Sequence, residues 1–250
     1  MSRSRPEHLE LPRTDDVVPP RRRLLSLLRP AGRLVLNRRF DIRQHGVEHL
    51  PVSGGCILAA NHIGLLDGPL ITTVARRPVH FLTKKEMFDG RLGAVLRVVG
   101  QIPLARREYD ASAVKGCVRV LRDGGVVGIF PEGGRGDGEL RTCHAGAAYL
   151  ALVTGAPIVP VAVFGTREPG GHVDSAPGRG ARLDLVYGAP IWLPEQPWPR
   201  RQDEVRRTSR MLRNRLRDHL VEATVLTGLS LPGPIPGAAA PLPDPRAKEM

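Results

Sequence analysis

The stretch that decides the fold is residues 56–76, "CILAANHIGLLDGPLITTVAR". Its first five residues, 56–60, are all apolar and predict a strand buried on both faces. Residues 68–76 suit a helix, with Asp67 as its N-cap and Pro69 in its first turn. The strand stops abruptly at a histidine, and a carboxylate follows five positions later. This pattern is compatible with a catalytic pair and with an ordinary strand-to-helix turn.

The same alternation of strands and helices continues from about residue 41 to residue 190. Further strands are expected at 79–83, 101–105, 126–130, 157–165 and 181–188, and further helices at 91–99, 111–125, 144–155 and 203–223. Near-continuous apolar strands that alternate with helices indicate a mostly parallel central sheet flanked by helices. The predicted fold is therefore a single α/β domain. The last helix is expected to dock on it through the apolar stripe of Val205, Met211, Leu212, Leu216, Leu220 and Ala223.

Composition adds a charge signal to this fold. The chain has 250 residues, a 41% apolar fraction, and 37 Lys+Arg against 25 Asp+Glu, which gives a formal net charge of +12. Such a surplus indicates an anionic partner, which is a membrane surface, a nucleic acid or a phosphorylated substrate. A general bias towards arginine explains the same surplus without a partner. Three widely spaced cysteines without a CxxC pair argue against a disulfide framework and a structural zinc site.

The basic residues gather near the N-terminus, in residues 21–43, "RRRLLSLLRPAGRLVLNRRFDIR". Eight arginines and six leucines predict one or two short basic amphipathic helices, interrupted near Pro30. Such a segment can dock in an anionic lipid interface. The alternative is a surface helix packed on the body with solvated arginines.

The ends of the chain predict little structure. Residues 1–20 are expected to be disordered, and residues 229–250 to be a flexible tail rich in Pro and Ala. No apolar run typical of a signal peptide occurs at the N-terminus. The uncharged run 142–166 is long enough for a membrane span, but glycine and prolines interrupt its middle, so we expect a buried helix, a turn and a strand there.

Several chemistries lack their motif. No lysine is followed by Ser or Thr, no GxGxxG follows a strand, and no serine lies in GxSxG. Few aromatic residues are available to stack bases, so we expect no nucleic-acid partner. Polar residues do follow the expected strands, at Asn61-His62, Lys84-Lys85-Glu86, Arg106-Arg107 and 131–136. Ligands bind at the carboxyl ends of strands in open α/β sheets, so these groups are expected to converge on one cleft.

His62 and Asp67 can form a proton-handling pair. On a continuous helix their spacing of five residues turns them about 140° apart, so they meet only if the backbone between them is not helical. Gly64 makes such a turn plausible. A carboxylate that accepts from one imidazole N–H fixes the tautomer, and the other ring nitrogen can then take a proton from an alcohol that attacks a carbonyl.

The basic residues suit an anionic substrate. Arg106 and Arg135 can offer forked donors to a phosphate, and Gly133 with its neighbouring glycines lets a ligand approach closely. Glu132 can accept from a substrate hydroxyl or orient an arginine. For each residue the alternative is a surface salt bridge or a turn.

Four segments together resemble a known family. They are "NHIGLLD" (61–67), "GQIPLAR" (100–106), "FPEGGRG" (130–136) and "PIVPVAVFG" (157–165). In this order they resemble the motifs of the glycerolipid acyltransferases, the family of 1-acylglycerol-3-phosphate acyltransferase. The resemblance spans roughly residues 45–190, and NHx4D followed by FPEGxR makes it specific.

The resemblance implies a role for each matched residue. His62 would be the general base and Asp67 its orienting partner. Arg106 and Arg135 would hold the phosphate of the acceptor, and Glu132 would help to position it. The donor would be an acyl thioester of coenzyme A or of acyl carrier protein, used as a co-substrate. Transfer would be direct, with no metal and no other cofactor.

Departures from the family pattern leave the acceptor open. Gly134 and Gly136 replace the usual threonine and serine, and Pro103 lies inside the second motif. The acceptor is lysophosphatidic acid, glycerol 3-phosphate, another lysophospholipid or a glycolipid. Either Lys84 or Lys85 is a candidate to assist phosphate binding.

The expectation is an acyltransferase domain at residues 44–225, docked by residues 21–43 on the inner, cytoplasmic face of an anionic cell membrane. Its reaction would belong to phospholipid biosynthesis. One alternative is a non-catalytic membrane- or nucleic-acid-binding protein, which explains the charge but not the motifs. Another is a thioester hydrolase that uses the same His62 with water.

Overall fold

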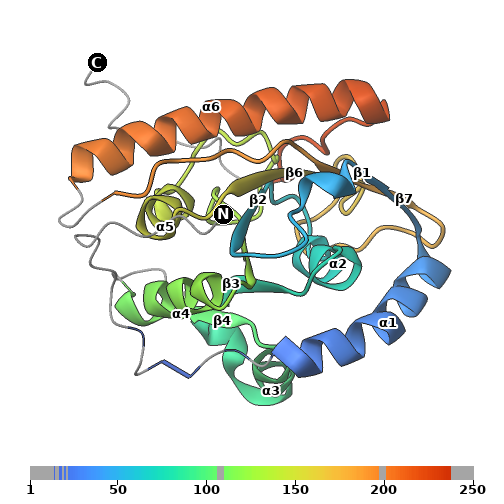
Figure 1. The fold of residues 1–250 in the computed structure, drawn as a ribbon. Helices are drawn as coiled ribbons and strands as arrows, with labels where there is room; N and C mark the ends of the chain where they lie inside the picture. The colour runs from blue at the N-terminus through green and yellow to red at the C-terminus, as the bar shows by residue number, and fades with distance from the viewer. Residues whose placement is uncertain are drawn as a thin grey trace.

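The structure, a computed structural model, describes residues 14, 17–18, 20, 22–105, 110–196 and 201–237. Its strands are β1 (Asp41–His45), β2 (Cys56–Ala60), β3 (Val79–Lys84), β4 (Ile102–Leu104), β5 (Val126–Ile129), β6 (Ile158–Phe164) and β7 (Arg182–Tyr187). Its α-helices are α1 (Arg22–Arg39), α2 (Asp67–Val74), α3 (Gly90–Val98), α4 (Ala111–Arg122), α5 (Gly146–Thr154) and α6 (Gln202–Thr227) (Figure 1). Two short 3-10 turns are η1 (Val47–His49) and η2 (Lys85–Phe88).

The described strands form one sheet in the order β1-β7-β6-β2-β5-β3-β4. Strand β2 lies at its centre, paired in parallel with β5 and β6. Strands β1 and β7 are parallel to each other, and β7 pairs antiparallel with β6, so this edge runs opposite to the rest. Every residue of β2, β5 and β6 is buried, which explains their continuous apolar sequences. The predicted α/β fold with a mostly parallel sheet is confirmed.

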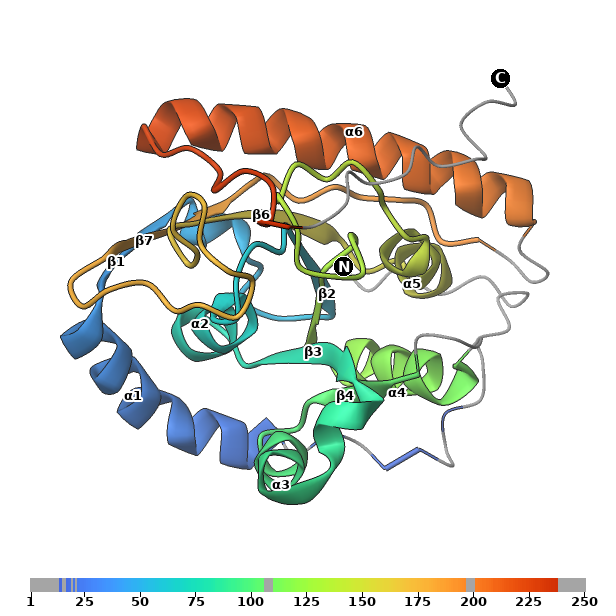
Figure 2. The same cartoon turned by 180° about the vertical axis from the view of Figure 1, so that it is seen from behind.

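Helices cover both faces of the sheet, and alternate side chains of β2 point to the two layers. Ile57 and Ala59 pack with side chains of α4, α5 and α6. Leu58 and Ala60 pack on the other face with side chains of α2. Figures 1 and 2 show α6 along one side of the molecule and α1 on the opposite side.

Helix α6 docks through the predicted stripe, with two differences. Leu212, Leu216, Leu220 and Ala223 are buried as predicted, together with Ser209 and Thr227. Met211 is exposed, because it is one residue, about 100°, away from Leu212 on the helix surface. Val205 is only partly buried.

Helix α1 is continuous, so the predicted interruption near Pro30 is wrong. Arginines on both sides of the proline hold the helix on the C-terminal end of α2. Arg29 donates to the carbonyl oxygens of Thr73 and Ala75, and Arg33 donates to that of Val74 at 2.8 Å. These bonds satisfy carbonyls that a helix end leaves without partners. They also hold α1 in place on both sides of Pro30, where the helix lacks one internal hydrogen bond.

The segment predicted to dock on lipid therefore has two different faces. One face packs on the protein, with Leu25 buried. The other exposes four apolar side chains, Leu27, Leu28, Leu34 and Val35. The last residues of the segment, 41–43, belong to strand β1. That strand was not predicted, because a strand at the edge of a sheet can be exposed to solvent and does not require a continuous apolar sequence.

The segment predicted as a flexible C-terminal tail begins with ordered contacts. Leu229 and Leu231 pack against the core, Gly170 N donates to Pro232 O at 3.4 Å, and Arg167 donates to Gly233 O at 2.7 Å. Residues 238–250 lie outside the described residues. Of the predicted N-terminal disorder, only residues 14, 17, 18 and 20 are described, and Thr14 Oγ1 accepts from Arg122 at 2.8 Å.

Candidate active site

The site begins where β2 leaves the sheet, at Asn61. Its side-chain Nδ2 donates to Val163 O at 3.1 Å, and its Oδ1 accepts from Val163 N at 2.7 Å. The amide side chain thus takes the place of a backbone partner for β6. The main chain can therefore turn away from the sheet directly at His62.

His62 and Asp67 meet in the turn that follows. His62 Nδ1 lies 2.7 Å from Asp67 Oδ2, which also accepts from Ile63 N at 2.7 Å and from Gly64 N at 2.9 Å. Asp67 Oδ1 accepts from the hydroxyl of Thr166. The carboxylate is fully buried and accepts four hydrogen bonds, which compensate for its removal from water.

This geometry corrects the predicted N-cap. The residue that precedes α2 is Leu66, and Asp67 is the first residue of the helix. Its side chain turns back to the amides of 63 and 64 instead of capping α2. Gly64 permits the turn, because a Cβ there would lie 2.6 Å from Thr166 O.

The hydrogen bond to Asp67 assigns the tautomer of His62. Because the carboxylate accepts, Nδ1 carries the proton and Nε2 of the neutral ring keeps its lone pair. No described residue hydrogen-bonds Nε2. The imidazole stacks on Phe130, with centroids 3.9 Å apart and planes 10° apart, and Phe130 stacks on Phe81. The ring of His62 is thus held by Asp67 on one edge and by Phe130 on one face, and no described residue contacts its Nε2 through a hydrogen bond.

The loop after β5 fixes the backbone of His62 from both sides. Glu132 Oε1 accepts from His62 N at 2.9 Å, and Gly136 N donates to His62 O at 2.9 Å. Burial raises the pKa of Glu132 to about 7, although the bond from the His62 amide opposes this shift. The carboxyl ends of β2 and β5 therefore converge, as the sequence predicted.

The glycines of this loop differ in what they permit. Gly133 has φ 74°, and a Cβ there would lie 2.6 Å from the ring of His144, so a side chain does not fit. At Gly134 a Cβ would meet nothing within 4 Å. At Gly136 it would lie 3.9 Å from Glu132 Oε2, an ordinary contact. A Cβ thus has room at 134 and 136, where the motif that "FPEGGRG" resembles usually has threonine and serine.

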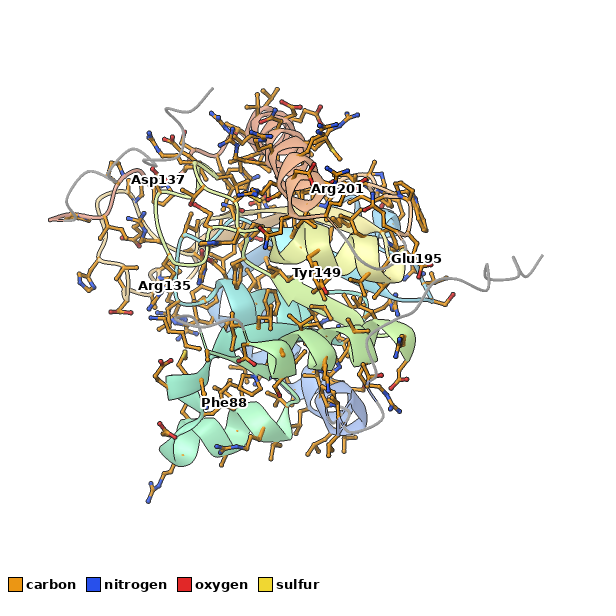
Figure 3. The ribbon with its side chains drawn as sticks, turned by 90° about the vertical axis from the view of Figure 1, so that its left-hand side faces the viewer. Phe88, Arg135, Asp137, Tyr149, Glu195 and Arg201 are labelled. Carbon is orange, nitrogen blue, oxygen red and sulfur yellow. The ribbon has the colours of Figure 1, made fainter. Side chains whose placement is uncertain are left out.

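The structure gives different results for the residues predicted to bind phosphate. Arg135 Nη1 pairs with Asp174 Oδ1 at 2.6 Å and donates to Val173 O at 3.1 Å. Figure 3 shows Arg135 and Asp137 on one side of the molecule and Glu195 on the other. Arg106 lies outside the described residues. Lys84 ends β3 and Lys85 begins η2, and both are exposed.

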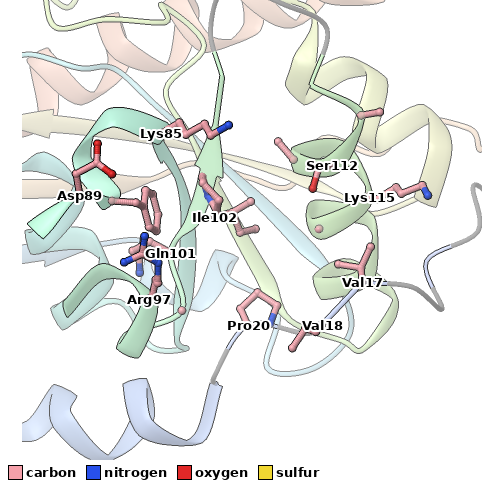
Figure 4. Close-up of a pocket in the computed structure, with 16 residues that line it drawn as sticks. Val17, Val18, Pro20, Lys85, Asp89, Arg97, Gln101, Ile102, Ser112 and Lys115 are labelled. Atoms are coloured by element: carbon pink, nitrogen blue, oxygen red, sulfur yellow. The ribbon is translucent and has the colours of Figure 1, made fainter. Parts of the chain in front are cut away.

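Lys85 lines a cavity of about 760 Å³ between η2, α3, β4 and α4. Figure 4 shows Lys85 and Arg97 on one side of this cavity and Ser112 on the other. Phe88, Ile102 and several alanines and glycines give it a largely apolar wall. The cavity shares no lining residue with the His62–Asp67 pair.

Two residues of the site were missed by the sequence analysis, Thr166 and Arg167. Arg167 is almost fully buried, and its partners among the described residues are backbone carbonyls: Ile63 O at 2.8 Å, Gly171 O at 3.1 Å, Gly136 O at 2.9 Å and Gly233 O at 2.7 Å. It joins the turn after β2, the loops after β5 and β6, and the C-terminal segment. The signal was available, because these polar residues follow the predicted apolar strand 157–165.

Comparisons with known proteins place the chain in a family. The acyltransferase family model matches residues 41–164. The chain is 30% identical over 165 residues to 1-acyl-sn-glycerol-3-phosphate acyltransferase of Bacillus subtilis (strain 168), which covers 64% of this chain and 79% of that protein. It is 33% identical over 128 residues to the protein of the same name from Borreliella burgdorferi, of which it spans 51%, with 49% of this chain covered.

The fold also matches a solved structure, the 1-acyl-sn-glycerophosphate (LPA) acyltransferase, PlsC, from Thermotoga maritima. The TM-score is 0.59 at 23% identity, with 80% of this chain and 79% of that chain covered. The fold and the matches define an enzyme of the acyltransferase class. Within that class, the chain belongs to the 1-acyl-sn-glycerol-3-phosphate acyltransferase family.

Proposed function

We propose that the enzyme transfers a fatty acyl group from an acyl-coenzyme A or acyl carrier protein thioester to the free hydroxyl of a lysophosphatidic-acid-type acceptor, in phospholipid biosynthesis. The observation that supports this most is the 2.7 Å bond between His62 Nδ1 and the buried carboxylate of Asp67, which leaves Nε2 available. His62 is the general base in this proposal, and Asp67 holds its tautomer.

The reaction balances without a covalent acyl-enzyme. His62 Nε2 takes the proton of the acceptor hydroxyl while that oxygen attacks the thioester carbonyl. A carbon–oxygen bond forms and the carbon–sulfur bond breaks. The imidazolium then gives its proton to the departing thiolate. Asp67 stabilises the imidazolium because the two groups share a short, buried hydrogen bond.

The acceptor side of the proposal rests on the loop after β5. Gly136 N donates a hydrogen bond to the main-chain carbonyl of His62, so Arg135 is one residue from a backbone contact with His62. A guanidinium there can bind a phosphate with two parallel hydrogen bonds. Arg106 is proposed as a second phosphate ligand, and Glu132 as a residue that positions the acceptor.

We further propose that the enzyme is peripheral on the inner face of an anionic membrane. None of the described helices combines the length and the apolar character that a membrane span requires. Helix α1 offers Leu27, Leu28, Leu34 and Val35 to the solvent, and Arg38 and Arg39 lie in its last turn. An exposed apolar stripe with cations nearby suits the interface of an anionic bilayer.

The direct test is thiol release from palmitoyl-coenzyme A, measured with and without lysophosphatidic acid. We expect release that depends on the acceptor, and a loss of at least about 100-fold in His62→Ala, because general bases typically contribute 10²–10⁴-fold. The matched control is His45→Ala, which removes another His–Asp contact, at 2.8 Å to Asp184, on the edge strand β1. It should retain activity.

Two outcomes would overturn the proposal. Turnover near the wild-type rate in His62→Ala would show that His62 is not the general base. Release that is the same without any lysolipid would indicate a hydrolase that uses water.

A further inference from the structure

The guanidinium proposed to bind phosphate already has an anionic partner. Arg135 Nη1 is 2.6 Å from Asp174 Oδ1 and 3.1 Å from Val173 O. Both bonds use the same nitrogen, so Asp174 does not form the two-pronged pair that a guanidinium can make. The side chain of Asp174 is 59% exposed and that of Arg135 is 27% exposed, so the pair is open to exchange.

Asp174 is presented by a structured loop between β6 and β7. Ser175 N and Ser175 Oγ donate to His172 O at 3.0 and 2.6 Å, and Gly171 N donates to Glu168 O at 2.9 Å. Arg167 holds the base of the loop through its bond to Gly171 O. Because the loop is tied internally and at its base, it keeps Asp174 beside Arg135.

We propose that Asp174 and the phosphate of the acceptor compete for Arg135, so that the β6–β7 loop forms part of the subsite for a phosphorylated headgroup. This inference rests on the proposed assignment of Arg135 to the phosphate. A phosphomonoester has more charge and more acceptor oxygens than a carboxylate, and it can engage both prongs of the guanidinium. It can therefore displace Asp174, whereas a phosphate-free acceptor leaves the ion pair intact.

The competition has a defined effect on affinity. An acceptor that needs Arg135 binds only the fraction of molecules in which Arg135 is released, which raises its apparent dissociation constant by the inverse of that fraction. Acceptors that make no contact with Arg135 are unaffected. Asp174 is therefore a specificity-determining residue that weakens the preference for phosphorylated acceptors.

The test compares Asp174→Asn with the wild type on lysophosphatidic acid and on the phosphate-free 1-monoacylglycerol. We expect the KM for lysophosphatidic acid to fall about threefold, the size typical of an exposed ion pair, with kcat within about twofold. The KM for monoacylglycerol should not change. Asp123→Asn, which removes the exposed pair to Arg119 on α4, is the matched control and should change neither value.

A second background makes the test specific to the ion pair. In Arg135→Gln, the change Asp174→Asn should have no further effect, because the group for which the two anions compete is gone. An unchanged or higher KM for lysophosphatidic acid in Asp174→Asn would overturn the inference. An equal fall for monoacylglycerol would also overturn it.

Equilibrium binding separates this inference from the proposed function. Glycerol 3-phosphate, titrated calorimetrically into the full chain, should bind about threefold more tightly to Asp174→Asn. Equal binding to both proteins would contradict the competition even if acyl transfer is observed. Tighter binding in a chain that transfers no acyl group would support the competition and leave only the proposed function in error.

Discussion

Asp67 shows how the polar residues of the site depend on one another. Its carboxylate orients His62 through one oxygen, which also accepts from two backbone amides, while the other oxygen accepts from Thr166. The Thr166 hydroxyl therefore limits the rotation of the carboxylate. The group is fully buried, so water cannot replace a donor that is lost. A carboxylate oxygen that loses one donor therefore has an unsatisfied hydrogen-bonding position, which costs free energy.

Removing the Thr166 hydroxyl should affect stability and rate together. Thr166→Val keeps the shape of the side chain but leaves Asp67 Oδ1 without this donor. We expect the free energy of unfolding to fall by about 1–3 kcal/mol, with a lower kcat, in urea denaturation and steady-state kinetics. Thr224→Val removes a hydroxyl that donates within its own helix, to Leu220 O, and should be close to neutral. Equal losses in both variants would contradict a special role for Thr166.

Glu132 predicts a dependence of stability on pH. Burial raises the pKa of this carboxyl to about 7 in the folded protein, from an ordinary value of 4.5. The folded state therefore binds the proton more tightly than the unfolded state, and this contribution to stability is lost as pH rises towards and through 7. Glu132→Gln keeps an oxygen for His62 N but does not ionise. Relative to this variant, the wild type should lose roughly 3 kcal/mol between pH 4 and pH 8.

The measurement for Glu132 is urea denaturation of both proteins at several pH values. If the difference between their free energies of unfolding is the same at pH 4 and pH 8, the carboxyl does not titrate with a raised pKa.

At the scale of elements, the sequence predicted most strands and helices because their burial is uniform. Cys56–Ala60 is apolar throughout and was placed correctly, since a strand covered on both faces has no polar side. Strand β1 was missed because its sequence, "DIRQH", is polar and its pattern of exposure is that of an edge. The continuity of α1 through Pro30 was also not predicted, because a proline usually interrupts a helix and the bonds from Arg29 and Arg33 to α2 join residues distant in the sequence.

Helix α1 gives a prediction for membrane binding. Leu27→Glu with Leu34→Glu should weaken binding to phosphatidylglycerol vesicles by roughly tenfold or more, because two exposed leucines can no longer enter the apolar layer. Vesicle co-sedimentation measures this. Val221→Glu with Val225→Glu, on the exposed face of α6, is the matched control and should bind as the wild type does. An equal loss in both double variants would indicate a charge effect rather than docking through α1.

For the whole molecule, sheet order explains why distant motifs meet. Strands β6, β2 and β5 are parallel neighbours, so the segments that follow them converge at the carboxyl ends of these strands. The convergence of His62 with the loop that contains Glu132 was predictable from this rule. The clamp made by Arg167 was not, because it depends on where four loop carbonyls lie in space. The pairing of Arg135 with Asp174 was unpredictable for the same reason.

The proposed role of His62 is to direct an acyl group to a lipid hydroxyl. The most direct measurement is mass spectrometry of the products from isotope-labelled palmitoyl-coenzyme A and lysophosphatidic acid, with the wild type and His62→Ala. We expect labelled diacyl product with the wild type and at least about 100-fold less with the variant. Labelled free fatty acid as the main product of the wild type, or equal diacyl product from both proteins, would contradict it.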